Sequence, residues 1–168
     1  MHILPILLAA CSTPEPSPIV ESTPEPTAVE ALNAMDTRTP VPLQPMMAWH
    51  QKQNMQAHLV AIQGITAALA EQDWEGVSQA SVTIQSSPQM AAQCEHMGAG
   101  AKGFTELALD FHQRADGIAL AAEKQDTQAV LQATAHTLQA CTTCHARYRQ
   151  DVVDAQTWTG RTGTPFAH

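Results

Sequence analysis

The stretch VLQATAHTLQACTTCHARYRQDV, residues 130–152, decides the fold and carries the most specific chemistry of this 168-residue chain. Its apolar and small residues recur every three or four positions, which is typical of one face of an α-helix. That face consists of Val130, Thr134, Thr137 or Leu138, Cys141, His145, Tyr148 and Val152. Because residues three and four apart share a face, we expect Cys141, Cys144 and His145 to point together toward a helical interior.

Three more segments with helical spacing precede this one, at about 46–71, 74–86 and 101–124. In the first, apolar residues stand at 55, 59, 62, 65 or 66, and 69. We read 88–100 as a connection, extend the last helix over 127–155, and take 156–168 as a tail. No segment shows the alternating pattern of apolar and polar residues that would predict a β-strand. Four helices with one stripe each predict an all-α fold, an antiparallel four-helix bundle over residues 46–155.

The composition favours a helical fold and excludes some classes of function. Aromatic residues make up only 4% of the chain, whereas Ala, Gln, Met and Leu, which favour helices, are abundant. A chain so poor in aromatic residues has a modest core, which a large apolar cofactor would help to fill. The net charge of −8 argues against nucleic acid as a partner, since nucleic-acid binding needs a basic face.

The first eleven residues, MHILPILLAAC, form an apolar run that ends at Cys11. The run is too short to span a membrane and has the length of a signal-peptide core. Its last four residues resemble a bacterial lipobox, which implies cleavage before Cys11 and lipidation of that residue. The resemblance implies a periplasmic lipoprotein, and Ser12 favours the outer membrane over the inner one. The alternative is an ordinary secretory peptide with an incidental cysteine.

Residues 12–45 are rich in Pro, Thr and Glu, and STPEP occurs twice, at 12–16 and 22–26. Proline removes backbone donors and favours extended backbone. We therefore expect a disordered, semi-rigid tether without a core, with at most a brief helical turn at 28–35. Its role would be to hold the helical domain away from a lipid surface.

The C-x-x-C-H spacing at 141–145 is the attachment signature of haem c, in which two thiols bind the vinyl groups and the imidazole ligates iron. The same residues allow three alternatives. A thioredoxin-like redox pair belongs at a strand-to-helix junction. A zinc site would need Cys94 and His96 together with Cys141 and Cys144, and would leave His145 unused. A disulfide between Cys141 and Cys144 would be strained on a helix. Haem attachment is the favoured interpretation.

The longer pattern C-x-x-C-H-x-x-Y-R on a last helix resembles the class II c-type cytochromes, the cytochrome c′ family. Lys102-Gly103-Phe104 and residues 121–126 also resemble this family, and the likeness covers about 46–152. It implies one covalent haem c in the core of the bundle. The residues that it assigns are Cys141 and Cys144 as thioether anchors, His145 as proximal iron ligand, and Tyr148 and Arg149 as haem environment.

The family divides at the other face of the iron. Some members are five-coordinate and bind nitric oxide or carbon monoxide, whereas others use a methionine of the first helix and carry electrons. The family position falls on or near Met55, which is our candidate distal ligand. Met55 as mere core filler is the alternative, and His58 is the rival ligand.

Two further points concern charged groups and a spare thiol. The arginine that the family often has four residues before the distal position is Gln51 here. Lys52, Arg147 and Arg149 are therefore the candidates for pairing with the haem propionates. Cys94 is either a buried inert thiol or a residue for an intermolecular disulfide or redox response.

Together these expectations describe a membrane-anchored electron-transfer protein that is not an enzyme. Its expected partners are redox proteins, the membrane through its lipid anchor, and a second copy of the chain in a homodimer. The alternatives are a five-coordinate protein that binds nitric oxide or carbon monoxide, and a zinc-stabilised interaction lipoprotein without haem.

Overall fold

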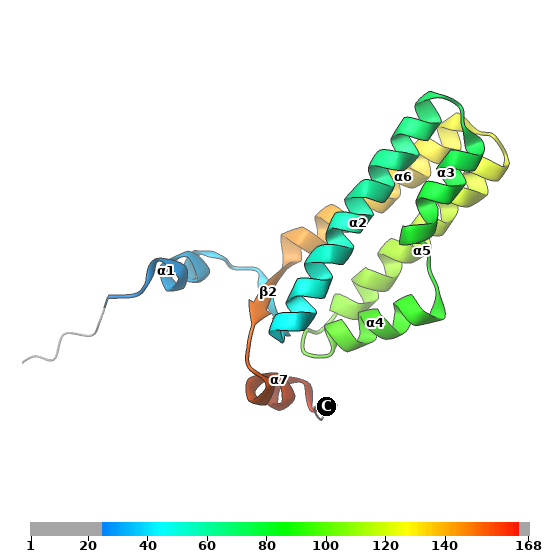
Figure 1. The fold of residues 1–168 in the computed structure, drawn as a ribbon. Helices are drawn as coiled ribbons and strands as arrows, with labels where there is room; N and C mark the ends of the chain where they lie inside the picture. Colours follow the sequence, from blue (N-terminus) through cyan, green and yellow to red (C-terminus); the bar gives the residue numbers. More distant parts are fainter. Residues whose placement is uncertain (1–24, 165–168) are drawn as a thin grey trace, which may run out of the picture. The chain divides into compact units, whose positions relative to one another are not determined.

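The computed structural model describes residues 25–164 (Figure 1). They fall into two units, the residues up to Asp36 and those from Thr37 onward. In the first unit, helix α1 (Ala28–Met35) begins with a capping box, in which the Thr27 hydroxyl accepts from the Glu30 N–H and the Glu30 carboxylate accepts from the Thr27 N–H. None of its residues is buried, so the cap rather than packing stabilises it. The expectation of at most a brief turn here was wrong.

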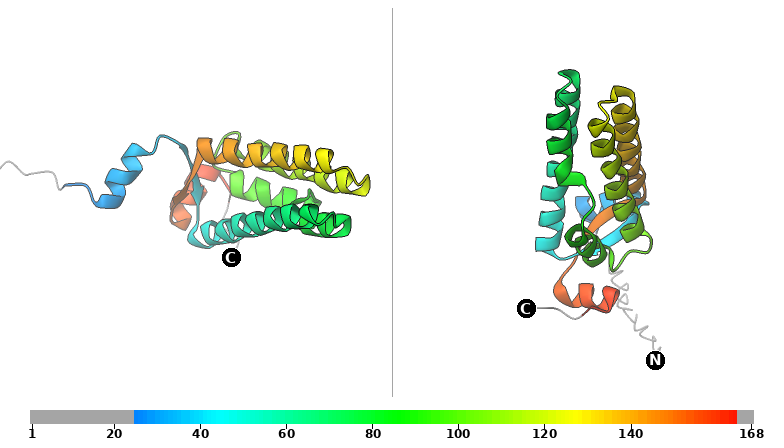
Figure 2. Two further views of the ribbon diagram at one scale, coloured as in Figure 1. Left: turned by 90° about the horizontal axis from the view of Figure 1, so that it is seen from above. Right: turned by 90° about the vertical axis from the view of Figure 1, so that its right-hand side faces the viewer.

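The second unit is mostly helical, as expected. Two helical hairpins dominate it, α2 (Pro45–Ala70) with α3 (Trp74–Ser81), and α5 (Phe104–Glu123) with α6 (Thr127–Arg147) (Figure 2). The short 3-10 helix η1 (Val82–Ile84) and α4 (Pro88–Gly98) connect them, and α7 (Ala155–Thr162) follows near the end. Asp73, Ser87, Asp126 and Asp154 each cap the helix that follows, because their side-chain oxygens accept a backbone N–H of its first turn.

A two-stranded parallel sheet joins the start and end of this unit. Strand β1 (Thr39–Leu43) pairs with β2 (Tyr148–Val152), so that Thr39 lies opposite Tyr148 and Leu43 opposite Val152. The expectation of no strand was therefore wrong, and the linker does not extend to 45, since Val41 and Leu43 are fully buried. Prolines are tolerated at 40 and 42 because only alternate residues of β1 direct their backbone groups toward β2. Leu43 is one of these residues, since its carbonyl accepts from the Val153 N–H.

Three other boundaries differ from expectation. Residues 88–98 form helix α4 rather than a plain connection, because Ser87 caps it and Pro88 occupies its first position, where a missing N–H costs nothing. Helix α6 ends at Arg147 rather than 155, since the chain turns there into β2. The expected tail contains α7, which buries Trp158 and ends at Gly163 with positive φ.

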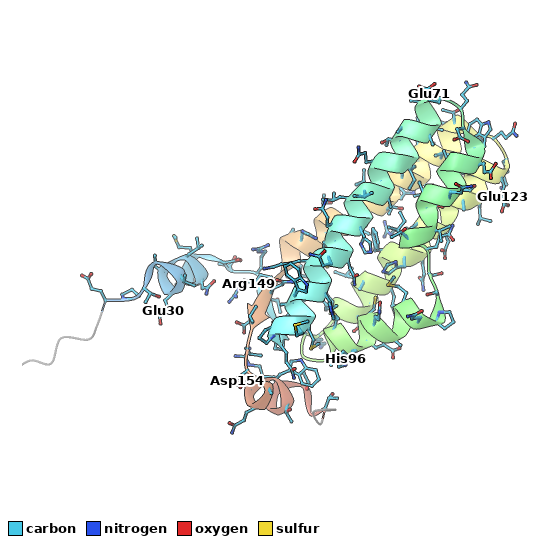
Figure 3. The ribbon with its side chains drawn as sticks, viewed as in Figure 1. Glu30, Glu71, His96, Glu123, Arg149 and Asp154 are labelled. Carbon is cyan, nitrogen blue, oxygen red and sulfur yellow. The ribbon has the colours of Figure 1, made fainter. Side chains whose placement is uncertain are left out.

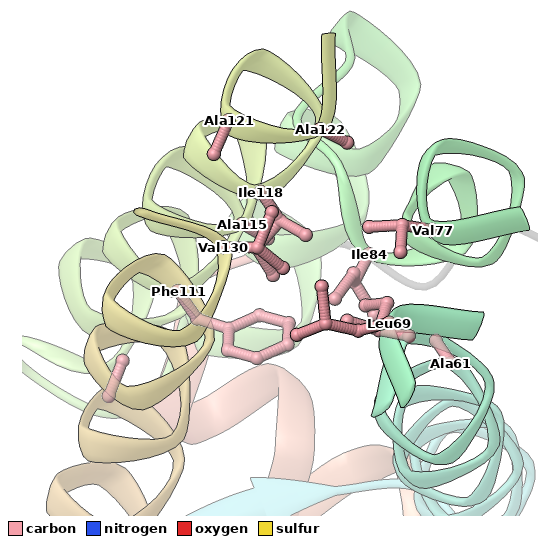
Figure 4. Packing of buried hydrophobic residues seen from close by; sticks show 12 residues of the cluster. Ala61, Leu69, Val77, Ile84, Phe111, Ala115, Ile118, Ala121, Ala122 and Val130 are labelled. Carbon is pink, nitrogen blue, oxygen red and sulfur yellow. The ribbon is translucent and has the colours of Figure 1, made fainter. Parts of the chain in front are cut away.

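The main core lies between the hairpins (Figure 4). Apolar side chains from α2, α3, η1, α5 and α6 converge there, and Ile65, Val77, Ile84, Ile118 and Val130 are fully buried. A second, smaller cluster sits at the end where the sheet lies, formed by Val41, Leu43, Ala48, Ala101, Phe104 and Tyr148. None of the helices between residues 25 and 164 combines the length and the apolar character needed to cross a membrane.

Candidate functional site

Cys141, Cys144 and His145 lie on the last turns of α6, next to the sheet. Both thiols are free and half-buried, and burial raises the pKa of each above its ordinary value. Cys141 packs against the main core and Cys144 against the smaller cluster. His145 is exposed, so the expectation that all three point to the interior holds for the thiols only. An accessible imidazole therefore stands beside two thiols that touch the core.

Contacts from other segments fix the end of α6. The Tyr148 hydroxyl donates to the Lys102 carbonyl at 2.7 Å, and its ring meets Phe104 edge-on at 5.3 Å between centroids. The Arg147 guanidinium lies 5.4 Å from the centroid of the same ring. Arg38 Nη1 donates to the His145 carbonyl at 3.2 Å and so caps an otherwise unpaired backbone group. The end of the turn that carries the cysteines is thus held by Arg38, just before β1, and by the segment that leads into α5.

Arg149 has a buried Nε–H with no hydrogen-bond partner among the described residues. The amide nitrogen of its neighbour Gln150 is engaged, because this Nε2 donates to the Ala48 carbonyl at 3.2 Å and to Gln51 Oε1 at 2.6 Å. An unpaired buried donor of this kind costs about 1–3 kcal/mol, more when it is charged. A carboxylate brought by a ligand would relieve that cost.

The buried face of α2 differs from the one expected. It runs through Gln51, His58, Ala61, Ile65 and Leu69, with His58 half-buried. The expected stripe started from Met55 and Leu59, but Leu59 is 63% exposed and Met55 is 37% exposed. The reason is the contact with α3, where small residues let the helices approach: Gly64 lies against Ala80, and Ala68 against Gly76. Met55, Leu59 and Ile62 are left on the opposite flank of α2.

That flank of α2 faces α6. Helix α6 packs on α5 through its own small residues, with Ala133 against Gly117, and this leaves Leu138 and His145 on its other flank. The helices α2 and α6 run in opposite directions and scarcely contact each other, whereas every other adjacent pair of the two hairpins packs extensively. Leu138 is consequently 39% exposed.

Met55 and His145 lie at about the same level on these flanks. The Gln51–Gln150 hydrogen bond ties the lower part of α2 to β2. Met55 is one helical turn beyond Gln51, and His145 is about one turn before the start of β2. By this count of turns, the thioether on α2 lies at about the level of the imidazole and the two thiols on α6.

His58, the rival ligand, lies on the buried face of α2 and is half-buried. Its ring stacks on Phe111 at 4.9 Å and meets His112 edge-on at 5.4 Å. His112 Nδ1 lies 2.8 Å from the Ile84 carbonyl, so this nitrogen carries the proton. Burial, with a smaller contribution from His112, lowers the pKa of His58 to about 4. His58 is therefore neutral at neutral pH and packed against an aromatic ring. The seven- and four-residue spacing of Gln51, His58, Ile65 and Leu69 was the sequence signal for this face.

The zinc alternative lacks a donor set. Between residues 25 and 164, no three His, Cys, Asp or Glu side chains are arranged to hold a metal ion. Cys94 is buried on α4, and His96 instead contacts the Trp158 ring at 5.5 Å. Burial, and then the adjacent Glu95, raise the pKa of Cys94, which fits the inert-thiol interpretation. Cys11, the lipidation candidate, lies outside the described residues.

No family model matches the chain, and neither does any curated protein or solved structure with which it was compared.

Proposed function

We propose that this chain binds one haem c covalently and transfers electrons as a class II c-type cytochrome, exported and anchored by a lipid on Cys11. One observation carries the proposal. Cys141, Cys144 and His145 share the last turns of α6, with both thiols free and half-buried and the imidazole accessible. Only haem attachment uses all three residues.

The residues present fit this group. Cys141 and Cys144 would hold the ring by thioether bonds, His145 would ligate the iron, and Met55 is the candidate for the opposite side. Arg149 would donate a hydrogen bond to a propionate, because its buried Nε–H has no other partner in the described part of the chain. When bound, haem c supplies an iron that changes between the ferric and ferrous states.

The surroundings suit a flat apolar ring. In this proposal α2, α3, α5 and α6 form the antiparallel four-helix bundle, with the ring held between α2 and α6. These two helices pack weakly and present Leu59 and Leu138 to each other's side. Covering such side chains removes apolar surface from water, which is favourable by roughly 25 cal/mol per Å². A neutral His58 close by adds no charge to the interior.

A second candidate function is binding of nitric oxide or carbon monoxide at a five-coordinate iron. The observation in its favour is Leu59, the next residue after Met55 on the flank of α2 that would face the ring, which is 63% exposed and offers no hydrogen-bond donor. An apolar side of this kind would leave a small neutral gas as the natural ligand.

The first test is a pyridine haemochrome assay on protein exported in a host that attaches haem c. We expect a c-type spectrum with one haem per chain. The double variant Cys141→Ala/Cys144→Ala should lose covalent haem, whereas Cys94→Ala, a matched control at a thiol outside the site, should keep it. A wild-type chain without a c-type spectrum would refute the proposal.

The second test separates the two candidate functions through Met55→Ala. Electron transfer with methionine ligation predicts a low-spin ferric spectrum with the long-wavelength sulfur-to-iron band, and loss of that band in the variant. Met46→Ala, also on α2 and 63% exposed, should leave the spectrum unchanged. A low-spin spectrum that survives Met55→Ala but not His58→Leu would assign His58 instead. A high-spin spectrum with rapid carbon monoxide binding would favour the gas-binding function.

A further inference from the structure

Charge is distributed unevenly along the helical unit. At the end far from the sheet, the turns between α2 and α3 and between α5 and α6, with the residues beside them, carry five exposed acids and one exposed base. Figure 3 labels two of these acids, Glu71 and Glu123. The acids are Glu71, Asp73, Glu75, Glu123 and Asp126, and the base is Lys124. The far end is therefore strongly acidic.

The opposite end, where Cys141, Cys144 and His145 lie, carries exposed bases. Lys102 and Arg147 are neighbours, since the Arg147 guanidinium lies against Gly103 and the Tyr148 hydroxyl reaches the Lys102 carbonyl. Lys52 follows Gln51, whose side chain bonds to β2. Lys102 and Arg147, here called the basic cluster, are exposed, as is Lys52 in the first part of α2, and no carboxylate of the described residues forms an ion pair with any of the three.

The acids near the basic cluster offset it only in part. Asp151 is already paired with Arg161 at 2.5 Å, and Asp154 caps α7 through the Thr157 N–H. Glu106, on the first turn of α5, is the acid closest to Lys102 along the chain. The local charge at the sheet end is thus positive, in a chain whose net charge is −8.

We propose that the basic cluster is a docking surface for an acidic redox protein, which it would hold against the end of α6. This rests on the proposed function, because the surface has a purpose only if electrons enter or leave beside His145. The basic cluster differs from Arg149 in burial. The guanidinium of Arg149 is half-buried and is therefore placed to bind a group inside the protein, whereas the exposed side chains of the basic cluster can contact a partner protein.

The charge distribution would orient the encounter. Fields at a protein surface act over about one Debye length, roughly 10 Å at 0.1 M salt, so the nearest charges dominate at contact. An acidic protein is repelled by the far end and attracted by the sheet end. Complementary charges of this kind mainly raise association rates and fix orientation.

The test uses the haem-loaded protein and two small oxidants of opposite charge, the anionic ferricyanide and the cationic tris(phenanthroline)cobalt(III). Stopped-flow oxidation of the ferrous protein is measured from low to high salt. The net charge alone predicts that the ferricyanide rate rises with salt. The basic cluster predicts the reverse, a fall of roughly threefold or more, and a rise for the cationic oxidant. A ferricyanide rate that rises with salt would overturn the proposal.

Lys102→Glu and Lys124→Glu form a matched pair, because both exposed lysines change to the same acid and alter the net charge equally. We expect Lys102→Glu to slow ferricyanide about threefold at low salt, and Lys124→Glu to change the rate by less than about half as much. Equal effects would contradict a local surface. Lys102→Gln should give a smaller slowing in the same direction, and circular dichroism checks that each variant is folded.

A binding measurement gives a readout independent of redox activity. In an NMR titration with an oligoglutamate peptide, we expect shifts around residues 102 and 147 that disappear at high salt and in Lys102→Glu. Shifts spread evenly over the protein would refute the docking surface. Stronger binding to phosphatidylglycerol vesicles than to the peptide would assign the surface to lipid and overturn the protein-partner proposal. The haemochrome assay decides the proposed function separately.

Discussion

The main core and the side of the unit between α2 and α6 differ in how completely their apolar side chains are packed. Toward the far end, Val77, Ile118 and Val130 are fully buried where α3, α5 and α6 meet. On the side between α2 and α6, Leu59 is 63% exposed and Leu138 is 39% exposed, on helices that scarcely contact each other. The comparison teaches that the main core stabilises the fold, which leaves the side between α2 and α6 without a packing role.

The largest expected effect tests the far end. Ile118→Ala removes buried methyl groups from the centre of the main core, and such changes cost about 2–5 kcal/mol. The matched change on the side between α2 and α6, Leu138→Ala, removes a similar side chain that is already partly in water and should cost less than about 1 kcal/mol in the haem-free chain. Urea unfolding measures both. Equal losses would mean that the two regions are packed alike.

The next effect tests the polar interior between the two ends, through pH. The folded-state pKa of His58 is about 4, below the ordinary 6.5, so the unfolded chain binds more protons between these values. The free energy of unfolding should therefore fall as pH drops from about 6.5 to 4, and this contribution should level off below 4. It amounts to about 3 kcal/mol at most.

Comparison with His58→Gln isolates this contribution from the titration of carboxylates elsewhere. The wild-type protein should lose stability over that range more steeply than the variant, when both are measured by urea unfolding. His112, whose pKa burial also lowers, adds a smaller dependence that the variant keeps. Parallel curves for the two proteins would show that His58 is hydrated and does not belong to the interior.

The same comparison explains what the sequence could predict. The far end follows simple periodicity: Val130, Thr134 and Thr137 were expected on one face of the last helix, and they are buried there. The motif at 141–145 was equally readable, since its spacing places the residues on neighbouring turns. Local rules suffice where a stripe of buried residues and a helix coincide.

The sheet end depends on contacts between distant segments, which periodicity does not contain. Nothing local reveals that α2 turns its Gly64 flank to α3 and so leaves Met55 at the side. The sequence of strand β1 is typical of a linker because it contains Pro40 and Pro42. The backbone nitrogens of these prolines face away from β2, so the pairing of the strands does not need them as donors. The sequence marks His58 only as a rival ligand, because a histidine among Gln and Ala residues gives no signal of its aromatic partner Phe111.

A third prediction sharpens the comparison at the sheet itself. The Tyr148 hydroxyl donates to the Lys102 carbonyl at 2.7 Å and ties β2 to the start of α5. Tyr148→Phe keeps the ring contact with Phe104 and removes only this bond, so the expected loss of unfolding free energy is about 1 kcal/mol. Hydrogen exchange should rise at residues 148–152 and not in α3. A loss spread over the whole unit would mean that the sheet end is as cooperative as the far end.

The smallest expected effect distinguishes exposure that serves a ligand from exposure without purpose. Leu59→Gln replaces an apolar side chain that is mostly in water, so in the haem-free variant Cys141→Ala/Cys144→Ala it should change the free energy of unfolding by no more than about 0.5 kcal/mol. In the haem-loaded protein the same change should cost about 1 kcal/mol or more, because the ring would cover Leu59. Val60→Gln, 56% exposed and one residue along the helix, points away from α6 and should cost equally little in both backgrounds. If Leu59→Gln also costs the same in both, the ring does not lie against this flank of α2, and the assignment of Met55 falls with it.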